Sequence, residues 1–527
     1  MKGKKVDLVV HNAQIHVLDD QNSVHEAMAI SNGKIVEVGP ERQILNKYRS
    51  DESIDAQGKD IYPGLTDAHG HLFSYAKQLL AVDLTTAKSM NELVILCEKF
   101  ASRNNSKFIV GRGWDQSLWN TKELPNYDAL NKAFPNTPVC LYRVDGHAAL
   151  VNKALLKKAK IDASTQVDGG KVMLTNGEPN GILLDNAMNL VAKLLPVYSE
   201  REIAEKLIEI QNELFQYGIV GVHEAGVSQK ELNYLKHLVD KGKLDLEIYA
   251  MLMPTQENFD FVRKNGIYKY KNLSVRSFKV FADGALGSRG ALLKKPYSDD
   301  THNHGLLLTS VEEMKKVANF CLDKGYQMNT HGIGDSANAL ILKIYENAFK
   351  RNSDHRFRVE HAQVIDPIDF QKFAAFAVFP SVQPTHAVSD QRWAEARLGK
   401  ERLKGAYAYK TLLNQFGMLA VGTDFPVEKT NPFLTIHAAV QRKNADNQPL
   451  DGFLANEALT LEQVMRGMTI WAAFAAFREN ETGTLEEGKN ATFVIFESPI
   501  ISGPVFEQNF AWKTFIKGKL VYNAEGL

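Results

Sequence analysis

The stretch Gly64-Leu65-Thr66-Asp67-Ala68-His69-Gly70-His71-Leu72 predicts a β-strand that ends in two histidines separated by one residue. Residues i and i+2 of a strand point to the same face, so we expect His69 and His71 to converge on one small volume. Imidazole suits Zn²⁺ and neighbouring divalent ions, and Gly70 places no side chain near such an ion. A pair of polar histidines at a strand end is the alternative, and the rest of the chain has to decide.

Outward from this stretch, short apolar segments alternate with longer helical patterns. The expected strands are 108–110, 139–142, 219–222, 248–252, 275–281, 327–330, 358–360, 376–379 and 419–423, and helical spacing predicts helices over 202–217, 311–324 and 335–352. This alternation implies a parallel sheet. We therefore expect a (β/α)₈ TIM-like barrel over residues 61–479, with a large insert at roughly residues 100–200. A doubly wound open sheet is the alternative, but no GxGxxG motif opens a helix after a strand.

Both ends of the chain predict short strands. The early segments are separated by turns such as Asn32-Gly33, a dipeptide typical of β-hairpins. Near the other end, 491–496, 512–516 and 520–522 have the same character. Neither end is long enough to bury a sizeable core alone, so we expect residues 1–60 and 480–527 to form one small discontinuous β-domain.

The composition narrows the classes of function. The 527 residues are 44% hydrophobic and 24% charged, as in soluble globular proteins, and Lys+Arg and Asp+Glu are both 62, so no basic surplus points to nucleic acid. Cys97, Cys140 and Cys321 form no CxxC pair, which argues against a disulfide framework and against thiolate zinc. We expect no export signal and no membrane span. The expectation is a cytoplasmic protein with a small-molecule substrate; a homodimer stays open.

Lys279 lies in the expected apolar strand 275–281, where an uncompensated ammonium group is costly. One explanation is a salt bridge to Asp283 or another carboxylate. The other is that burial lowers the pKa of Lys279, so that the amine reacts with CO₂ to form a carbamate. A carbamate is a carboxylate-like group that can bridge two metal ions.

Three more candidates lie at the ends of expected strands. His331 and His361 each follow a short strand, and Asp424 ends the last one, just before Phe425-Pro426. Barrel enzymes place their chemistry at the carboxyl ends of the strands, which would bring these side chains to His69 and His71. Taken singly, each has a structural alternative, such as a turn aspartate. His223 has a comparable position but no partner nearby, and we interpret it as structural.

Together these segments resemble the amidohydrolase superfamily, in particular the amidohydrolase family 3 branch with YtcJ-like and N-substituted formamide deformylase-like proteins. The resemblance covers nearly the whole chain, including the closing segment 483–491. The motifs that carry it are Gly64 to His71, Lys279 followed by Asp283-Gly284-Ala285-Leu286-Gly287-Ser288-Arg289, His331, Glu360-His361 and Gly422-Thr423-Asp424.

The resemblance implies a metal-dependent hydrolase of an amide-like carbon-nitrogen bond other than a peptide bond, with divalent metal, zinc expected, as one or two ions. The implied ligands are His69, His71 and Asp424 on one ion, His331 and His361 on the second, and carbamylated Lys279 between them. Without the carbamate, a mononuclear site of His69, His71, His331 and Asp424 stays open. In the expected mechanism Asp424 takes a proton from the activated water and returns it to the leaving nitrogen.

Two segments of the insert, Gly111-Arg112-Gly113-Trp114-Asp115 and Arg143-Val144-Asp145-Gly146-His147, resemble recurring segments of the same family. We expect Trp114, Asp115 and His147 to contact the substrate, Trp114 as an apolar wall and His147 through a hydrogen bond. Packing of the insert is the structural alternative. Two other functions stay open: a deaminase of the same superfamily, and a metal-binding barrel without catalysis, against which the presence of every candidate ligand argues.

Overall fold

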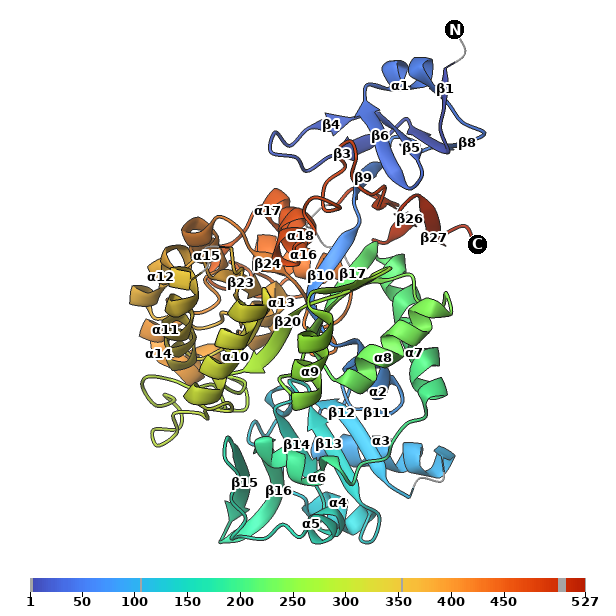
Figure 1. Cartoon of the computed structure of the whole chain (residues 1–527). Helices are drawn as coiled ribbons and strands as arrows, with labels where there is room; N and C mark the ends of the chain where they lie inside the picture. Colours follow the sequence, from blue (N-terminus) through green and yellow to red (C-terminus); the bar gives the residue numbers. More distant parts are fainter. Residues whose placement is uncertain (1–2, 105–106, 352–353, 501–508, 527) are drawn as a thin grey trace.

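The centre of the molecule is a closed barrel of parallel strands (Figure 1). The computed structural model describes residues 3–104, 107–351, 354–500 and 509–526. The eight strands, in their order around the sheet, are β10 (Leu65–Gly70), β17 (Ile219–Val227), β18 (Glu247–Leu252), β20 (Leu273–Phe281), β21 (Gln327–Gly332), β22 (Arg358–His361), β23 (Phe379–Val382) and β24 (Ala420–Val421). The two edges meet where Asp424 N–H donates to His69 O at 2.8 Å and His71 N–H donates to Phe425 O at 2.9 Å. The predicted (β/α)₈ architecture is confirmed.

Helices surround the barrel and begin at clear sequence signals. Capping boxes begin α7 (Glu200–Gln216) and α8 (Gln229–Asp240). Ser199 with Glu202 and Ser228 with Glu231 form them, which satisfies backbone N–H groups that the first turn leaves free. The outer helices are α7 (Glu200–Gln216), α8 (Gln229–Asp240), α9 (Gln256–Asn265), α10 (Val311–Lys324), α11 (Asp335–Arg351), α12 (Phe370–Ala375), α13 (Pro384–Asp390), α14 (Ala394–Leu403), α15 (Tyr409–Phe416), α16 (Pro432–Gln441), α17 (Leu461–Gly467) and α18 (Ile470–Ala475).

The seventh barrel strand begins later than the sequence predicts. Residues 376–379 were expected to form it, but Phe376 ends helix α12 and Ala377 has a φ of 50°, which a strand does not allow. The strand proper is β23, Phe379–Val382, paired in parallel with β22. This shift of three residues moves the carboxyl end of the strand to Val382.

The chain between α2 (Leu72–Leu79) and α7 forms a second, mixed sheet that extends from the barrel. It lies at the lower end of the view in Figure 1. Its first strand, at Val82–Asp83, precedes the expected start near residue 100. Leu93, Trp114 and Leu141 are fully buried in its core. Its strand order is β11 (Val82–Asp83), β12 (Ile109–Trp114), β13 (Val139–Arg143), β14 (Ala148–Val151), β16 (Glu178–Asp185) and β15 (Gly170–Thr175), with helices α3 (Met90–Asn104), α4 (Asp128–Ala133), α5 (Lys153–Ala159) and α6 (Asn189–Ala192).

The two chain ends share one sheet. Antiparallel pairing of β25 (Phe493–Phe496) with β9 (Asp60–Pro63) joins them, and Phe493 stacks on Phe515 with ring centroids 4.5 Å apart. That sheet runs β27 (Lys519–Asn523), β26 (Ala511–Ile516), β25 (Phe493–Phe496), β9 (Asp60–Pro63), β3 (Gln14–His16) and β4 (Val24–His25). The adjoining sheet runs β6 (Lys34–Gly39), β5 (Ala27–Ser31), β2 (Leu8–His11) and β8 (Glu52–Asp55), flanked by β1 (Lys4–Lys5), α1 (Glu41–Lys47) and β7 (Tyr48–Arg49).

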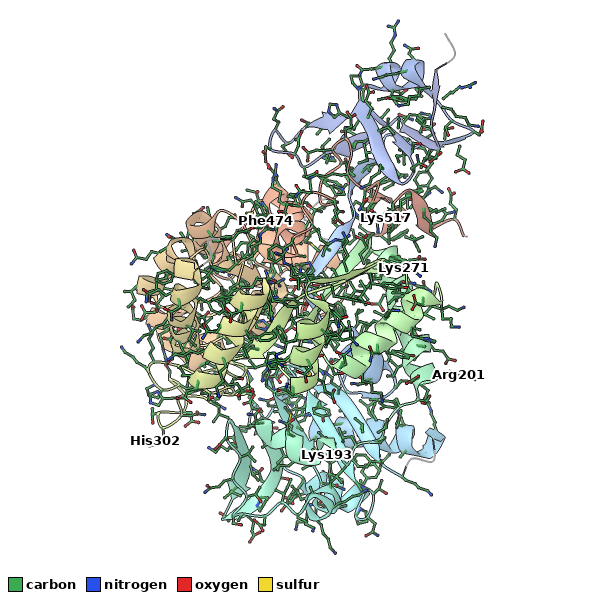
Figure 2. The ribbon with its side chains drawn as sticks, in the orientation of Figure 1. Lys193, Arg201, Lys271, His302, Phe474 and Lys517 are labelled. Carbon is green, nitrogen blue, oxygen red and sulfur yellow. The ribbon has the colours of Figure 1, made fainter. Side chains whose placement is uncertain are left out.

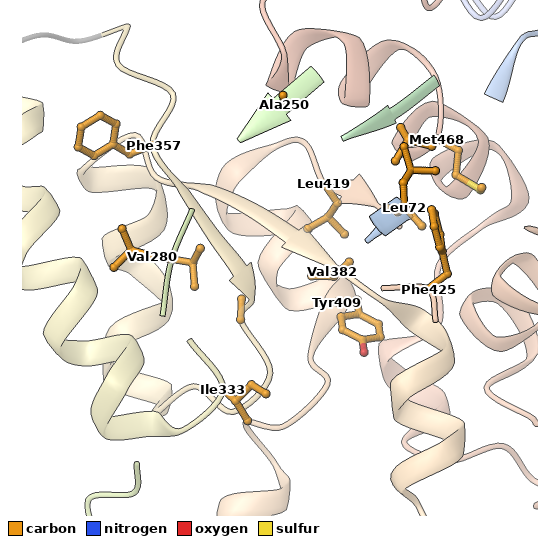
Figure 3. Packing of buried hydrophobic residues seen from close by; sticks show 14 of the residues in the cluster. Leu72, Ala250, Val280, Ile333, Phe357, Val382, Tyr409, Leu419, Phe425 and Met468 are labelled. Carbon is orange, nitrogen blue, oxygen red and sulfur yellow. The ribbon is translucent and has the colours of Figure 1, made fainter. Parts of the chain in front are cut away.

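The largest core cluster lies between the barrel strands and their helices. Figure 3 shows side chains from this cluster, including Val280 on β20, Val382 on β23 and Phe425 after β24. Charged side chains such as Lys193 and Lys271 lie on the outside (Figure 2). None of the helices in the described part of the chain has the length and apolar character needed to cross a membrane.

Candidate metal centre at the mouth of the barrel

The predicted ligands meet at the carboxyl end of the barrel. His69, Lys279, His331 and His361 lie on β10, β20, β21 and β22, while His71 and Asp424 come just after β10 and β24. Since all eight strands run parallel, their carboxyl ends open on one mouth. Five of these six residues are less than a tenth exposed, and the side chain of His71 is 21% exposed.

Asp424 is the residue on which two groups of ligand atoms converge. His71 Nε2 lies 3.0 Å and His69 Nε2 lies 3.6 Å from Asp424 Oδ1. On its other oxygen, Oδ2, His386 Nε2 approaches to 3.2 Å. The atoms of His69, His71 and Asp424 lie within 4.8 Å of one another, as do those of His361, His386 and Asp424. Either group has the spacing that a small cation requires.

Hydrogen bonds hold three of the histidines with one nitrogen facing the centre. The Nδ1 atoms of His69, His71 and His361 lie 2.5 Å from Glu360 Oε2, 2.9 Å from Ala225 O and 2.7 Å from Gln383 Oε1. All three partners are acceptors, so each ring carries its proton on Nδ1 and keeps a lone pair on Nε2. Metal-binding histidines are oriented in this way. The donor set therefore fits a divalent ion such as Zn²⁺.

Lys279 is buried next to this cluster. It is 1% exposed, and its Nζ lies 3.1 Å from His69 Nε2. Burial lowers the pKa of Lys279 to about 8. The alternative explanation, a salt bridge to Asp283 or another carboxylate, is not formed among the described residues. Asp283 instead accepts hydrogen bonds from the backbone N–H groups of Leu292, Ile333 and Gly334. No described carboxylate forms an ion pair with Lys279.

His331 and His147 extend the cluster toward the insert. The His331 ring lies 4.5 Å from the His361 ring between centroids, and its Nε2 lies 3.3 Å from Gly284 O. The His147 ring is 5.2 Å from that of His331, and its Nδ1 lies 2.7 Å from Asp185 Oδ1. The insert thus reaches the barrel mouth through His147. His331 belongs to neither of the two convergent groups around Asp424.

The shifted pKa values make the Asp424 carboxylate ionised and the imidazoles of His69, His331 and His361 neutral. Burial alone would raise the pKa of Asp424, but the hydrogen bond from His386 and the close approach of His71 hold that pKa well below its usual range. Burial lowers the pKa of His69 to about 4 and holds the pKa values of His331 and His361 well below their usual range. Neutral imidazole and ionised carboxylate are the protonation states that metal binding requires.

His386 is a site residue that sequence reasoning missed. It lies in the first turn of α13, four residues after β23 ends, and bridges Asp424 and Glu428, with Nδ1 at 3.2 Å from Glu428 Oε1. Burial lowers its pKa, but the hydrogen bonds to these two carboxylates outweigh that effect and raise it to about 10. The sequence does hold one signal for His386, namely its position shortly after the seventh strand. Because that strand was predicted three residues too early, His386 was not recognised.

The cluster opens into a cavity of about 1320 Å³ between the barrel mouth and the insert. Asp115 and His147 line this cavity, and Asp115 is paired with Arg143 at 2.8 Å. Trp114 does not line it. That side chain is fully buried in the insert core and donates from Nε1 to Leu141 O at 2.7 Å, so it does not form the expected apolar wall.

His223 lies deeper in the barrel, behind the cluster. Its Nδ1 is 3.0 Å from Arg358 Nη1. Arg358 also donates to Ala68 O at 2.8 Å and Ser381 Oγ at 2.9 Å, and forms an ion pair with Glu360 at 2.6 Å. This buried network ties four strands together beneath His69, and it gives His223 a structural place.

A parallel barrel with convergent histidines and an aspartate at its carboxyl mouth is the class of architecture used by metal-dependent barrel hydrolases. The sequence pattern of the Amidohydrolase family matches residues 52–522, and the chain belongs to that family. The resemblance drawn from the motifs is thereby confirmed.

Relatives align over nearly the whole chain. The putative amidohydrolase YtcJ of Bacillus subtilis is 29% identical over 97% of this chain and 98% of its own length. The protein LONG AFTER FAR-RED 3 of Arabidopsis thaliana is 32% identical over 99% of this chain and 92% of its own length. An N-substituted formamide deformylase of Arthrobacter pascens is 26% identical over 99% of each chain. A solved structure, an uncharacterized metal-dependent hydrolase from Pyrococcus horikoshii, covers 94% of this chain and 98% of its own, with 28% identity and a TM-score of 0.77.

Proposed function

We propose that this chain is a metal-dependent hydrolase that cleaves an amide-like carbon-nitrogen bond with water. The observation that carries the proposal is the position of Asp424, ionised and shared between the His69 and His71 side and the His361 and His386 side. A relative whose name states deformylation of N-substituted formamides supports the bond type.

The residues that would hold the ion are His69, His71 and Asp424, with His361 and His331 available for a second ion. Zinc suits this imidazole and carboxylate set. A bound divalent ion supplies Lewis acidity toward water and toward the substrate carbonyl. The buried amine of Lys279, which has no carboxylate partner among the described residues, is the group we expect to take up CO₂ as a carbamate, losing one proton, and so to complete the ligand set for two ions.

Asp424 then carries the proton through the reaction. A water O–H gives its proton to Asp424 as the water oxygen bonds to the substrate carbon. Asp424 passes that proton to the nitrogen as the carbon-nitrogen bond breaks, which yields a carboxylic acid and an amine. His386 holds Asp424 through Oδ2 and so leaves Oδ1 on the side of His71.

The experiment replaces Asp424 by Asn and measures metal content together with turnover of a panel of formamides and N-acyl amines. Loss of general base catalysis lowers kcat by about 10²–10⁴-fold. Asp51→Asn is the matched control, because the Asp51 side chain is 85% exposed. Wild-type turnover by a metal-loaded Asp424→Asn protein would rule out the proposed role. Release of ammonia from ring compounds, with no amide hydrolysed, would favour the deaminase alternative.

A further inference from the structure

Arg112 is a charged residue of the cavity that forms no ion pair with any described residue of the chain. It lies on β12 of the insert, within the Gly111 to Asp115 segment, and lines the same cavity as Asp424. Its one hydrogen bond within the described part of the chain is a long contact from Nη2 to Val144 O at 3.5 Å. Its Nε is buried without a partner. A guanidinium group stays charged at neutral pH and has five N–H donors to satisfy.

The neighbouring carboxylates are already engaged by another arginine. Arg143 Nη1 lies 2.5 Å from Asp145 Oδ2, and Arg143 Nη2 lies 2.8 Å from Asp115 Oδ1. The other oxygen of Asp145 accepts the backbone N–H of His147 at 3.0 Å. Arg392 adds a third guanidinium, 3.4 Å from Asp115. Three arginines therefore share two carboxylates, and Arg112 is the one left over.

The local backbone keeps space around this guanidinium group. Gly146 has a φ of 72°, and a Cβ added there would come within 3.0 Å of Arg112 Nη2. Leaving a partly buried cation unpaired is costly. A planar carboxylate would offset that cost, because its two oxygens match the fork of the guanidinium group.

We propose that Arg112 forms an anion-binding subsite, and that the substrate of the proposed hydrolase carries a carboxylate on the part that faces the insert. This inference rests on the proposed function for the identity of the reaction and adds the substrate class. Arg112 would bind the carboxylate while the scissile amide lies at the Asp424 end of the same cavity. Phe281 and Leu286, which also line the cavity, offer apolar contact to the portion between.

The kinetic test uses two substrates that differ only in the carboxylate, N-formylphenylalanine and N-formylphenethylamine. We expect the wild-type protein to prefer the first in kcat/KM, and Arg112→Gln to reduce that preference about tenfold or more, as for other buried charge pairs. Arg112→Lys keeps the charge and loses the fork of the guanidinium group. Its preference for N-formylphenylalanine should therefore lie between those of the wild type and Arg112→Gln. Arg201→Gln is the matched control, since Arg201 lies on the outer surface (Figure 2) and its side chain is 88% exposed.

A binding measurement separates the subsite from the reaction. We expect calorimetry on the purified protein to show that 3-phenylpropanoate binds more tightly than neutral 3-phenylpropanol. Arg112→Gln should remove this difference, and Arg201→Gln should keep it. Unchanged binding of 3-phenylpropanoate by Arg112→Gln overturns the proposal. If the binding difference is found but no amide is hydrolysed by the wild type, the subsite stands and the proposed function fails.

Discussion

Glu360 offers a direct test of how the barrel interior supports the cluster. It is fully buried on β22, accepts the Nδ1 proton of His69 at 2.5 Å, and pairs with Arg358 at 2.6 Å. Burial raises the pKa of Glu360, but the charge of Arg358 and the contact with His69 hold it below its usual range. We expect Glu360→Gln to weaken both metal retention and folding stability.

The two effects can be sized from the contacts that are lost. Removing one partner of a buried ion pair costs about 3–5 kcal/mol. Arg358 keeps its hydrogen bonds to Ala68 O and Ser381 Oγ, so we expect the lower end of that range. Loss of the group that orients a metal-binding histidine typically reduces metal affinity about 10–100-fold.

The assays measure each effect separately. Competition with a chelator gives the affinity for Zn²⁺, and thermal unfolding of the metal-depleted protein gives the stability change without a metal contribution. Glu205→Gln is the control, because Glu205 lies on the surface of α7 with a side chain 61% exposed. Adding Arg358→Met to Glu360→Gln should recover part of the lost stability, since no unpaired charge then remains. Wild-type zinc affinity in Glu360→Gln would refute the positioning role.

Two further predictions concern the residues that flank His69 and His71. Gly70→Ala should destabilise the protein by about 1–3 kcal/mol and lower its metal content, because the added Cβ would come within 2.3 Å of Phe425 Cε1. Thermal unfolding checks this, with Gly39→Ala as the control, because a Cβ at Gly39 would have ordinary contacts. Equal losses of stability in the two variants would contradict the prediction. Glu224 accepts the Leu72 N–H, and burial raises its pKa to about 8. Since its unfolded pKa is about 4.3, wild-type stability should be greatest at acid pH and fall between pH 5 and 8 relative to Glu224→Gln; parallel unfolding curves across that range would be the opposite result.

Much of the barrel and of the cluster could be predicted because both depend on local pattern and on one symmetry rule. Apolar segments separated by helical patterns identify the strands, and parallel strands place all their carboxyl ends together. Residues as distant in sequence as His71 and Asp424 therefore come within 3.0 Å without any sequence motif that links them. The same rule would have found His386, had the strand before it been placed at Phe379–Val382.

The misplacement of Trp114 has a different physical cause. Alternation along a strand predicts that Arg112 and Trp114, two residues apart, share one face. Gly113 has a φ of 109°, and the pairing of β12 with β13 slips between Arg112 and Trp114. A bulge of this kind redirects the following side chains. Arg112 consequently faces the cavity while Trp114 enters the core, a reversal that the period-two pattern cannot reveal.

The cavity is lined by the barrel on one side and by the insert on the other, and the two parts meet at Asp185. The candidate ligands come from the barrel, whereas the charged groups on the far side of the cavity, such as Arg112 and Arg143, come from the insert. Asp185 holds His147 and packs against the loop after β20, where a Cβ at Gly284 or Gly290 would approach its carboxylate oxygens to 2.6 Å. The Asp185 carboxylate lies directly against the backbone of these two glycines, so this contact sets the distance between the insert and the barrel mouth. A substitution at Gly290 should therefore disturb substrate binding before metal binding, because Gly290 lies against Asp185 and contacts none of the candidate ligands among the described residues.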